Sequence, residues 1–183
     1  MNLIAVIDTE TNWLDQVMSL GVVTADSAGF QPVSEKYYIF TPEYLSEGMY
    51  SDRMDLAEPE ILTRKAAMED LKQWLKDQGI SEIFAYNARF DCHHLPELQD
   101  FSWYDIMKIA AYRQHNFSIS PCADCCSTGR LKRNYGVEPI LRSLKGKPSY
   151  CETHNALLDA RDELQIMALL KRPLSLYQQC ASV

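Results

Sequence analysis

Acidic side chains occur in this chain at spacings that could bind metal ions. Asp8 and Glu10 follow an apolar run, Leu3 to Ile7, that is typical of a buried β-strand. Residues i and i+2 of a strand point to the same side, so the two carboxylates would leave the strand together. Like charges in that place repel each other and are costly to bury. A hard divalent cation removes this cost, so the pair predicts a metal site.

Two further carboxylates and a histidine could complete such a site. Asp91 lies in a predicted helix that directly follows a predicted strand, and Asp159 lies in the last predicted helix. Four carboxylates can hold two ions roughly 3.5–4 Å apart, which is the arrangement for in-line phosphodiester hydrolysis. His154 stands five positions before Asp159, at or before the start of that helix. Its imidazole could therefore take the proton of the attacking water.

These residues fall into segments that resemble known motifs. Asp8-Thr9-Glu10-Thr11, Asn87-x3-Asp91 and His154-x4-Asp159 are similar, in order and spacing, to the three exonuclease motifs of the histidine-type DEDD (DnaQ-like) 3′→5′ exonucleases. The resemblance extends from about residue 2 to residue 170. It implies a ribonuclease H-like fold, with Asp8, Glu10, Asp91 and Asp159 as metal ligands and His154 as the general base. Asp105 resembles a frequent structural aspartate of the family.

The motifs and one basic segment supply the expected substrate contacts. Residues 130–147 carry six basic side chains against the single acid Glu138, although the net charge of the chain is −7. A local basic surface can hold phosphates even on an acidic protein; the competing interpretation is a solvated helix face. Asn87 is also expected to cap the helix that carries Asp91. The predicted substrate-binding residues are Thr9, Thr11, Asn87, Phe90, Arg130, Lys132 and Arg133.

Several more polar residues are expected to have no part in the chemistry. Asp162 and Glu163 are predicted on the solvated side of the last helix, and His93 and His94 are predicted to be structural or surface residues. After Glu10 the chain has Asn12-Trp13 where many members of the resembling family have threonine and glycine. Contacts to the terminal nucleotide are made there in that family.

The cysteines suggest a second metal site. A structural Zn²⁺ could bind four thiols, with His115 as the alternative to Cys126. His154 also has zinc-ligand spacing from the last thiol, but one imidazole cannot be ligand and base at once. The competing hypothesis is reduced, partly buried thiols, as is usual in a chain of this size without a secretory signal. The zinc hypothesis concerns Cys122, Cys125, Cys126 and Cys151.

The remaining sequence predicts the frame that positions these residues. Three strands joined by short turns indicate an antiparallel meander, and strands alternating with helices follow them. The prediction is an α/β, ribonuclease H-like mixed central sheet, with three antiparallel strands and then parallel strands, flanked by helices. Residues 1–183 are expected to form a single exonuclease domain with a Cys-containing loop at about 116–129. The predicted strands are 3–8, 18–25, 33–40, 82–86 and 101–106; the predicted helices are 66–75, 87–96, 106–112, 138–144 and 154–170; residues 42–60 are predicted irregular.

Composition narrows the classes of protein. Apolar residues make up 46% and charged residues 23% of the chain, which is ordinary for a globular protein. No run reaches the roughly 18 apolar residues of a membrane span, and the amino terminus lacks the features of a signal peptide. We therefore expect a cytoplasmic protein with no membrane partner.

The sequence favours one function and leaves three competing functions open. The expected function is 3′→5′ hydrolysis of single-stranded nucleic-acid ends, with DNA as the expected substrate and two Mg²⁺ or Mn²⁺ ions as cofactors. A ribonuclease that trims RNA or oligoribonucleotides would carry the same residues. A catalytically silent nucleic-acid-binding or polymerase-associated module is the second competing function, and a zinc-organised interaction domain is the third. Residues 173–183 carry no obvious polymerase-binding motif, so a polymerase or replication partner stays open.

Overall fold

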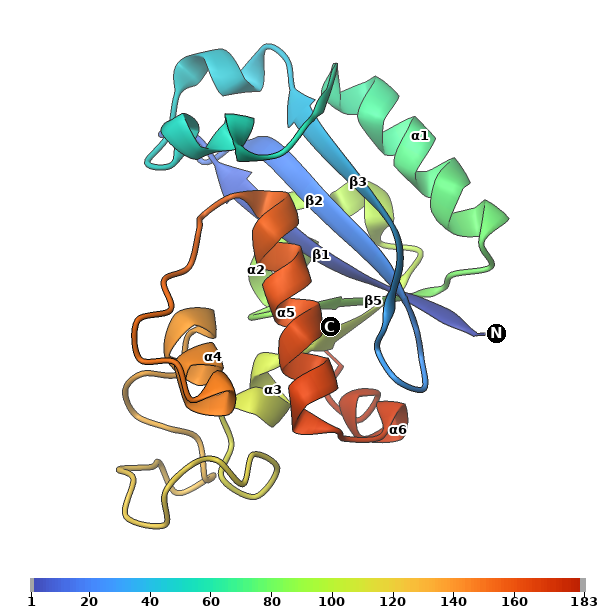
Figure 1. Cartoon of the computed structure of the whole chain (residues 1–183). Helices are drawn as coiled ribbons and strands as arrows, with labels where there is room; N and C mark the ends of the chain where they lie inside the picture. The colour runs from blue at the N-terminus through green and yellow to red at the C-terminus, as the bar shows by residue number, and fades with distance from the viewer. Residues whose placement is uncertain (1, 182–183) are drawn as a thin grey trace.

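The computed structural model describes residues 2–181, and these build a six-stranded mixed sheet with the strand order β4-β3-β2-β1-β5-β6 (Figure 1). β1, β2 and β3 pair antiparallel, whereas β5 is parallel to β1 and β6 is parallel to β5. The predicted antiparallel meander and the parallel strands after it are therefore confirmed. The strands are β1 (Leu3–Thr11), β2 (Val17–Asp26), β3 (Pro32–Phe40), β4 (Glu60–Leu62), β5 (Glu82–Ala85) and β6 (Ser102–Asp105).

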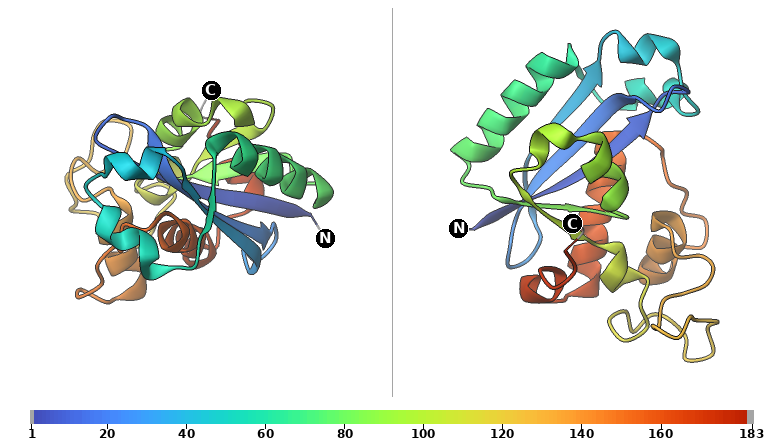
Figure 2. Two further views of the ribbon diagram at one scale, coloured as in Figure 1. Left: turned by 90° about the horizontal axis from the view of Figure 1, so that it is seen from above. Right: turned by 180° about the vertical axis from the view of Figure 1, so that it is seen from behind.

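Helices cover both faces of the sheet. β1 shows why: Ile4 and Val6 face a hydrophobic cluster with α5, while Ala5 and Ile7 face a second cluster with α1. α3, α4 and α6 lie on the α5 face, and α1 and α2 lie on the opposite face (Figures 1 and 2). The helices are α1 (Arg64–Asp77), α2 (Arg89–His94), α3 (Met107–Ala110), α4 (Val137–Lys145), α5 (Ala156–Leu170) and α6 (Leu174–Tyr177), with short 3₁₀ helices η1 (Glu43–Ser46), η2 (Ser51–Leu56) and η3 (Pro96–Leu98).

The buried side chain of Asn155 connects the start of α5 to the sheet by hydrogen bonds. Asn155 is the N-cap of α5 and accepts a hydrogen bond from the Leu158 N–H at 3.3 Å. The amide of Asn155 also donates to the Tyr37 hydroxyl at 3.1 Å and to the Arg53 carbonyl at 2.8 Å. One residue thus ties the first turn of α5 to β3 and to η2.

A glycine lets this helix approach the sheet closely. Gly21 of β2 pairs with Asp8 of β1. A Cβ at Gly21 would lie 2.2 Å from the Ala156 carbonyl oxygen and 2.3 Å from the Leu157 nitrogen. Because these are backbone atoms of the first turn of α5, only glycine lets the helix begin directly above the end of β1 that carries Asp8 and Glu10.

Two parts of the chain differ from the sequence predictions, and the predicted loop does not. Residues 42–60 were expected to be irregular but contain η1, η2 and the first residue of β4, which pairs parallel with β3. α6 was not expected, because four residues carry too little periodicity to indicate a helix. The expected loop 116–129 contains no helix or strand, as predicted, and its Cys126 N–H donates to the Arg130 carbonyl at 2.7 Å. Within residues 2–181 no helix has the length and apolar character needed to cross a bilayer.

Candidate functional site

Three elements bring the predicted acidic residues to one end of the sheet. Asp8 and Glu10 lie on β1 on the side that faces α5, in line with Ile4 and Val6. Asp159 is in the first turn of α5 and is 3% exposed. Asp91 is in the first turn of α2, at the end of β5, and is also buried. The strand-end arrangement expected from the sequence is what the fold provides.

Two of the acids and the predicted histidine are close enough together to share one cation. Ligand atoms of Glu10, His154 and Asp159 all lie within 4.8 Å of one another. Within the described residues the Asp159 Oδ1 atom is buried and has no hydrogen-bond partner. A buried carboxylate oxygen without a donor is costly, and a divalent cation would satisfy it. The residues present therefore fit a hard metal ion.

The pKa values of the four acids also indicate that positive charge is missing from the site. Burial and the neighbouring carboxylates, Glu163 first among them, raise the pKa of Asp8 well above its ordinary value. Burial and Asp159 raise the pKa of Glu10 to about 8, and burial raises the pKa of Asp91 to about 7. Burial, followed by repulsion from nearby acids, raises the pKa of Asp159 to about 7. Bound cations would reverse these shifts, because they favour the charged carboxylates.

Thr9 supports the second aspartate. Its hydroxyl is on the opposite side of β1 from Asp8 and Glu10, is buried, and donates to Asp91 Oδ1 at 2.8 Å. This hydrogen bond orients Asp91 and opposes the rise in its pKa. The sequence suggested that Thr9 binds substrate directly, whereas its buried hydroxyl is committed to Asp91.

Asn87 also has a different role from the one expected. The N-cap of α2 is Ala88, with no side-chain capping bond, so the prediction that Asn87 caps this helix is wrong. Asn87 instead adopts a left-handed conformation with φ 61°, which asparagine tolerates well. Its N–H donates to Asp105 Oδ1 at 3.0 Å, and Asp105 also accepts the Met107 N–H at 2.9 Å. The expected structural role of Asp105 is confirmed.

Glu163 and Glu152 lie near the site, which was not predicted from the sequence. Glu163 was expected on the solvated side of α5 but is 2% exposed, and its Oε2 accepts the Tyr86 N–H at 2.9 Å. The signal was present: Glu163 follows Asp159 by four residues, which places both on one helix face. Glu152 is in the segment before α5, and burial and nearby acids raise its pKa to about 7. Asp162, also expected to be solvated, is half-buried and pairs with Lys145 at 3.6 Å.

His154 lies just outside α5, as predicted. It precedes the N-cap Asn155 and has φ 56°, a conformation uncommon outside glycine and asparagine. Burial lowers its pKa below the ordinary value, so the imidazole is neutral near pH 7 and has a nitrogen free to accept a proton. Its position beside Glu10 and Asp159 is compatible with the role of a base.

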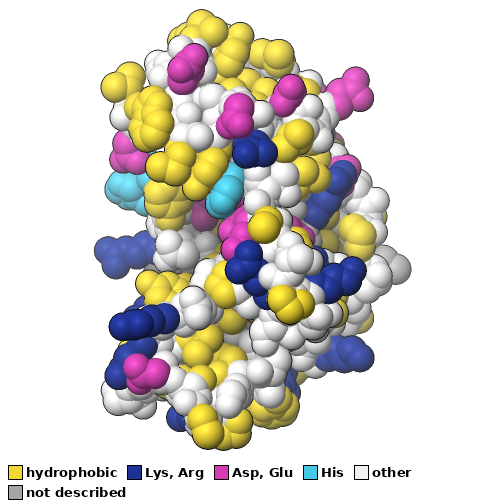
Figure 3. All heavy atoms as spheres, turned by 60° about the vertical axis from the view of Figure 1, so that its left-hand side comes forward, with side chains coloured by type: hydrophobic (Ala, Val, Ile, Leu, Met, Phe, Trp, Pro, Cys, Tyr) yellow, Lys and Arg dark blue, Asp and Glu magenta, His cyan; other side chains and the backbone are white. Residues whose placement is uncertain are grey.

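On the molecular face that carries the acids, hydrophobic and basic side chains lie on different sides of the acidic group (Figure 3). Figure 3 shows acidic side chains and a histidine in a hollow, with hydrophobic side chains gathered above it and Lys and Arg side chains below it. Trp13 and Leu14, in the turn after β1, are 66% and 67% exposed, and Phe90, next to Asp91, is 40% exposed. Thr11 ends β1, where the register with β2 shifts. The exposed Trp13 and Leu14 were not among the predicted contacts, although a tryptophan in the turn after two strand-end acids was a usable signal.

The basic segment is only partly free to bind an anion. Lys132 pairs with Asp124 at 2.9 Å and Arg142 pairs with Glu138 at 2.7 Å. The Arg130 guanidinium lies 5.0 Å from the Tyr135 ring centre, and Arg133 is exposed with no ion pair to another described residue. The segment is attached to the site, because the Tyr86 hydroxyl donates to the Tyr135 carbonyl while the Tyr86 N–H is held by Glu163.

The cysteines do not assemble into a metal site in the described part of the chain. All six are free thiols, and the only cluster of metal-ligand atoms found within residues 2–181 is the one formed by Glu10, His154 and Asp159. Cys151 contacts Arg142 at 3.8 Å, whereas Cys122, Cys125 and Cys126 lie in the 116–129 loop. The structure therefore does not bring Cys122, Cys125, Cys126 and Cys151 to the mutual distances of zinc ligands.

Comparisons with known proteins bear on the fold. The structure is similar to the nuclease domain of 3′hExo, a DEDDh family member, bound to rAMP: the TM-score is 0.65 at 13% identity, over 91% of this chain and 90% of that one. It is also similar to E. coli exonuclease I in complex with a dA16 oligonucleotide, with a TM-score of 0.65 at 13% identity over 98% of this chain. A 3′-exonuclease that recognises the 3′ end of a histone mRNA stem-loop matches with a TM-score of 0.63 at 12% identity, over 93% of this chain and 64% of that one.

These likenesses lie in structure, since no protein-family model and no curated protein matches the chain by sequence. The chain spans 42% of the exonuclease I chain. One of these structural neighbours is described as a DEDDh family member, all three are exonucleases, and the chain has the ribonuclease H-like fold that they share.

Proposed function

We propose that this chain is a metal-dependent 3′→5′ exonuclease that hydrolyses phosphodiester bonds at single-stranded nucleic-acid ends. The observation that carries the proposal is that Glu10 and Asp159 offer ligand atoms within 4.8 Å of each other and of His154, and that Asp8 and Asp91 lie near enough to interact electrostatically with both acids or with each other. Their raised pKa values and the unpartnered Asp159 Oδ1 support two Mg²⁺ or Mn²⁺ ions as cofactors. The shared sheet and its two hydrophobic clusters support a single exonuclease domain.

The protein groups then have separate tasks. Asp8, Glu10, Asp91 and Asp159 would hold the cations, which when bound would activate a water and stabilise the leaving oxygen. Thr9 keeps the Asp91 carboxylate in place. The neutral His154 imidazole accepts the proton that the water loses, beside Glu10 and Asp159.

The surface around the acids favours an unpaired strand. Exposed Trp13, Leu14 and Phe90 offer apolar surface on which bases can stack, which is sequence-tolerant and requires unpaired bases. Arg130 and Arg133 offer positive charge for the phosphates, from the segment that the Tyr86 hydroxyl joins to the site. Both sugars stay open in this proposal, because the choice depends on contacts to the 2′-hydroxyl.

The test is degradation of 5′-labelled single-stranded DNA and RNA with Mn²⁺, with EDTA and the Asp8→Ala variant as negative controls. The proposal expects a ladder that shortens from the 3′ end and disappears in both controls, and the faster substrate identifies the preferred sugar. Glu69→Ala removes an exposed acid from α1, on the opposite face of the sheet, and should leave the ladder unchanged.

Two results would contradict the proposal. Immediate release of the labelled terminal nucleotide would show the opposite polarity. Intact substrates with folded protein would indicate instead a catalytically silent binding module on the same fold, and filter binding of the same oligonucleotides would then detect it.

A further inference from the structure

The imidazole of His154 is held by an aromatic ring rather than by a hydrogen bond. The Tyr50 ring lies parallel to it, with ring centroids 4.0 Å apart and an interplanar angle of 9°. None of the hydrogen bonds among the described residues involves a ring nitrogen of His154, whereas both ring nitrogens of His94 are hydrogen-bonded. Since His154 lies outside α5 with φ 56°, regular structure does not orient its side chain either. The stacked ring is therefore the contact that sets the plane of the imidazole.

Tyr50 is itself tied to β1, the strand that carries Asp8 and Glu10. The Trp13 N–H donates to the Glu47 carbonyl at 3.0 Å. A Cβ at Gly48 would lie 2.5 Å from the Thr11 carbonyl oxygen, so the chain just before Tyr50 lies directly against the end of β1. Ser51 Oγ accepts the Gly48 N–H at 2.7 Å and closes this turn around Tyr50.

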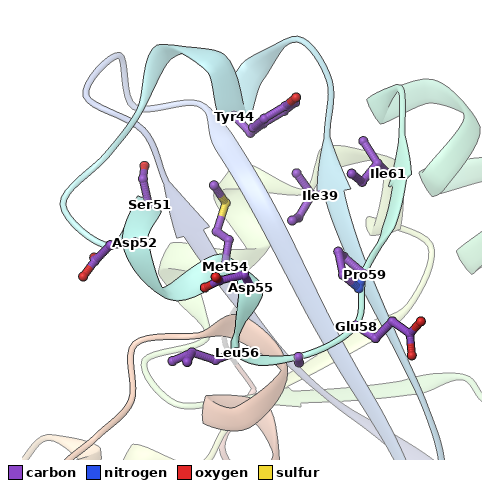
Figure 4. Close-up of a pocket in the computed structure, with 11 residues that line it drawn as sticks. Ile39, Tyr44, Ser51, Asp52, Met54, Asp55, Leu56, Glu58, Pro59 and Ile61 are labelled. Carbon is purple, nitrogen blue, oxygen red and sulfur yellow. The ribbon is translucent and has the colours of Figure 1, made fainter.

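The chain just after Tyr50 is tied to the start of α5. The Arg53 carbonyl accepts from the Asn155 amide at 2.8 Å, and the Met54 carbonyl accepts from the Tyr37 hydroxyl at 3.0 Å. Figure 4 shows this segment, η2, beside a pocket that Met54 and Ile39 help to line. Tyr50 is thus placed between an attachment to the strand of Glu10 and an attachment to the helix of Asp159.

We propose that Tyr50 is a positioning residue for His154. Its ring face fixes the plane of the imidazole beside Glu10 and Asp159, so that a ring nitrogen is presented to the water that attacks the phosphodiester. This inference rests on the proposed nuclease function. Because the face of the ring does the positioning, the Tyr50 hydroxyl is dispensable, and the two roles of the side chain can be separated by substitution.

The kinetic test compares Tyr50→Ala with Tyr50→Phe on the better single-stranded substrate. Loss of a positioned general base costs about 10²–10⁴-fold, and a misplaced one that still samples the correct geometry costs part of that. We expect kcat of Tyr50→Ala to fall roughly 10- to 100-fold, with KM changed by less than about threefold. Tyr50→Phe should stay within about twofold of the wild type.

The structural test does not require activity. The chain has four histidines, so ¹H–¹³C correlation spectra of the metal-free protein should show four sets of imidazole signals, with those of His154 identified by their loss in His154→Asn. The stacked ring should displace the His154 signals upfield. The displacement should vanish in Tyr50→Ala and persist in Tyr50→Phe. Phe90→Ala is the matched control, because the Phe90 ring centroid lies 4.3 Å from that of His94. Loss of the Phe90 ring should move the signals of His94 and leave those of His154 unchanged.

The outcomes separate this inference from the function on which it rests. Wild-type protein that degrades no substrate would remove the nuclease proposal. An active wild type with an unaltered kcat in Tyr50→Ala, or with His154 signals that do not move, would overturn the inference alone. A raised KM at unchanged kcat would also overturn it, since Tyr50 would then bind substrate. Unchanged signals of the other three histidines would show that Tyr50→Ala is folded.

Discussion

Replacing Gly21 by alanine should move the start of α5, with His154 and Asp159, away from β1, with Asp8 and Glu10, without changing any of these candidate site residues. The new Cβ would lie 2.2 Å from the Ala156 carbonyl oxygen, and the contacted atoms are backbone, so no flexible side chain can move aside. Carbon and oxygen need about 3.2 Å or more to avoid overlap at van der Waals contact. The first turn of α5 must therefore retreat from β2 by about 1 Å, and His154 and Asp159 retreat with it.

The size of the effect follows from this displacement. A misplacement of about 1 Å can cost roughly 100-fold in rate, so we expect a loss of that order in kcat. Overpacking costs about 1–3 kcal/mol, which for a domain of this size lowers Tm by about 2–12 °C. The rise in Tm on adding Mn²⁺ should shrink, because Glu10 and Asp159 no longer reach a shared ion.

The measurement combines thermal unfolding, with and without Mn²⁺, and the nuclease assay. Gly136→Ala is the matched control: Gly136 has φ −75°, and a Cβ there would meet nothing within 4 Å. Wild-type activity together with a full Mn²⁺ response in Gly21→Ala would refute the reasoning that close helix–sheet contact aligns the site.

Three further predictions concern the surroundings of the acids. The folded-state pKa values of Asp91 and Asp159 are raised from 3.8 to about 7, so their stabilising contribution is fully present below about pH 4 and is lost as the pH rises to about 7. Tm in EDTA should therefore fall between about pH 4 and 7, and Mg²⁺ should reduce the fall. A flat Tm profile over that range would contradict the assigned burial. Thr9→Val removes the hydrogen bond to Asp91 and should weaken Mn²⁺ binding by about 10-fold in calorimetry; unchanged affinity would mean that Thr9 does not orient Asp91. Asn155→Ala should lower the free energy of unfolding in urea by about 2 kcal/mol, because it removes the hydrogen bonds that hold the start of α5, and should also reduce activity. The control Thr63→Ala, at the N-cap of α1, should lower the free energy of unfolding by less and leave activity unchanged.

The sequence alone was sufficient to predict which end of β1 carries the acidic pair and most of the strands and helices of the fold. Asp8 and Glu10 were identifiable because strand geometry has a period of two, so two acids after an apolar strand must emerge together. The three antiparallel strands were predictable for the same reason, from apolar runs divided by turns. Short elements such as β4 and α6 were not predictable, since three or four residues carry no measurable period.

Only the tertiary structure decided which polar residues join the site and which support it. Buried Glu163 accepts a hydrogen bond from the N–H of Tyr86, the residue directly after β5 and 77 residues away in the chain. The thiols of the 116–129 loop and Cys151 had suitable spacing for zinc, yet spacing does not determine distance between segments that no sheet or helix connects. Tyr50 reaches His154 across 104 residues through a stacking contact that leaves no mark in local sequence. Local periodicity determines the direction of a side chain on its own element, whereas packing between elements determines what that side chain meets.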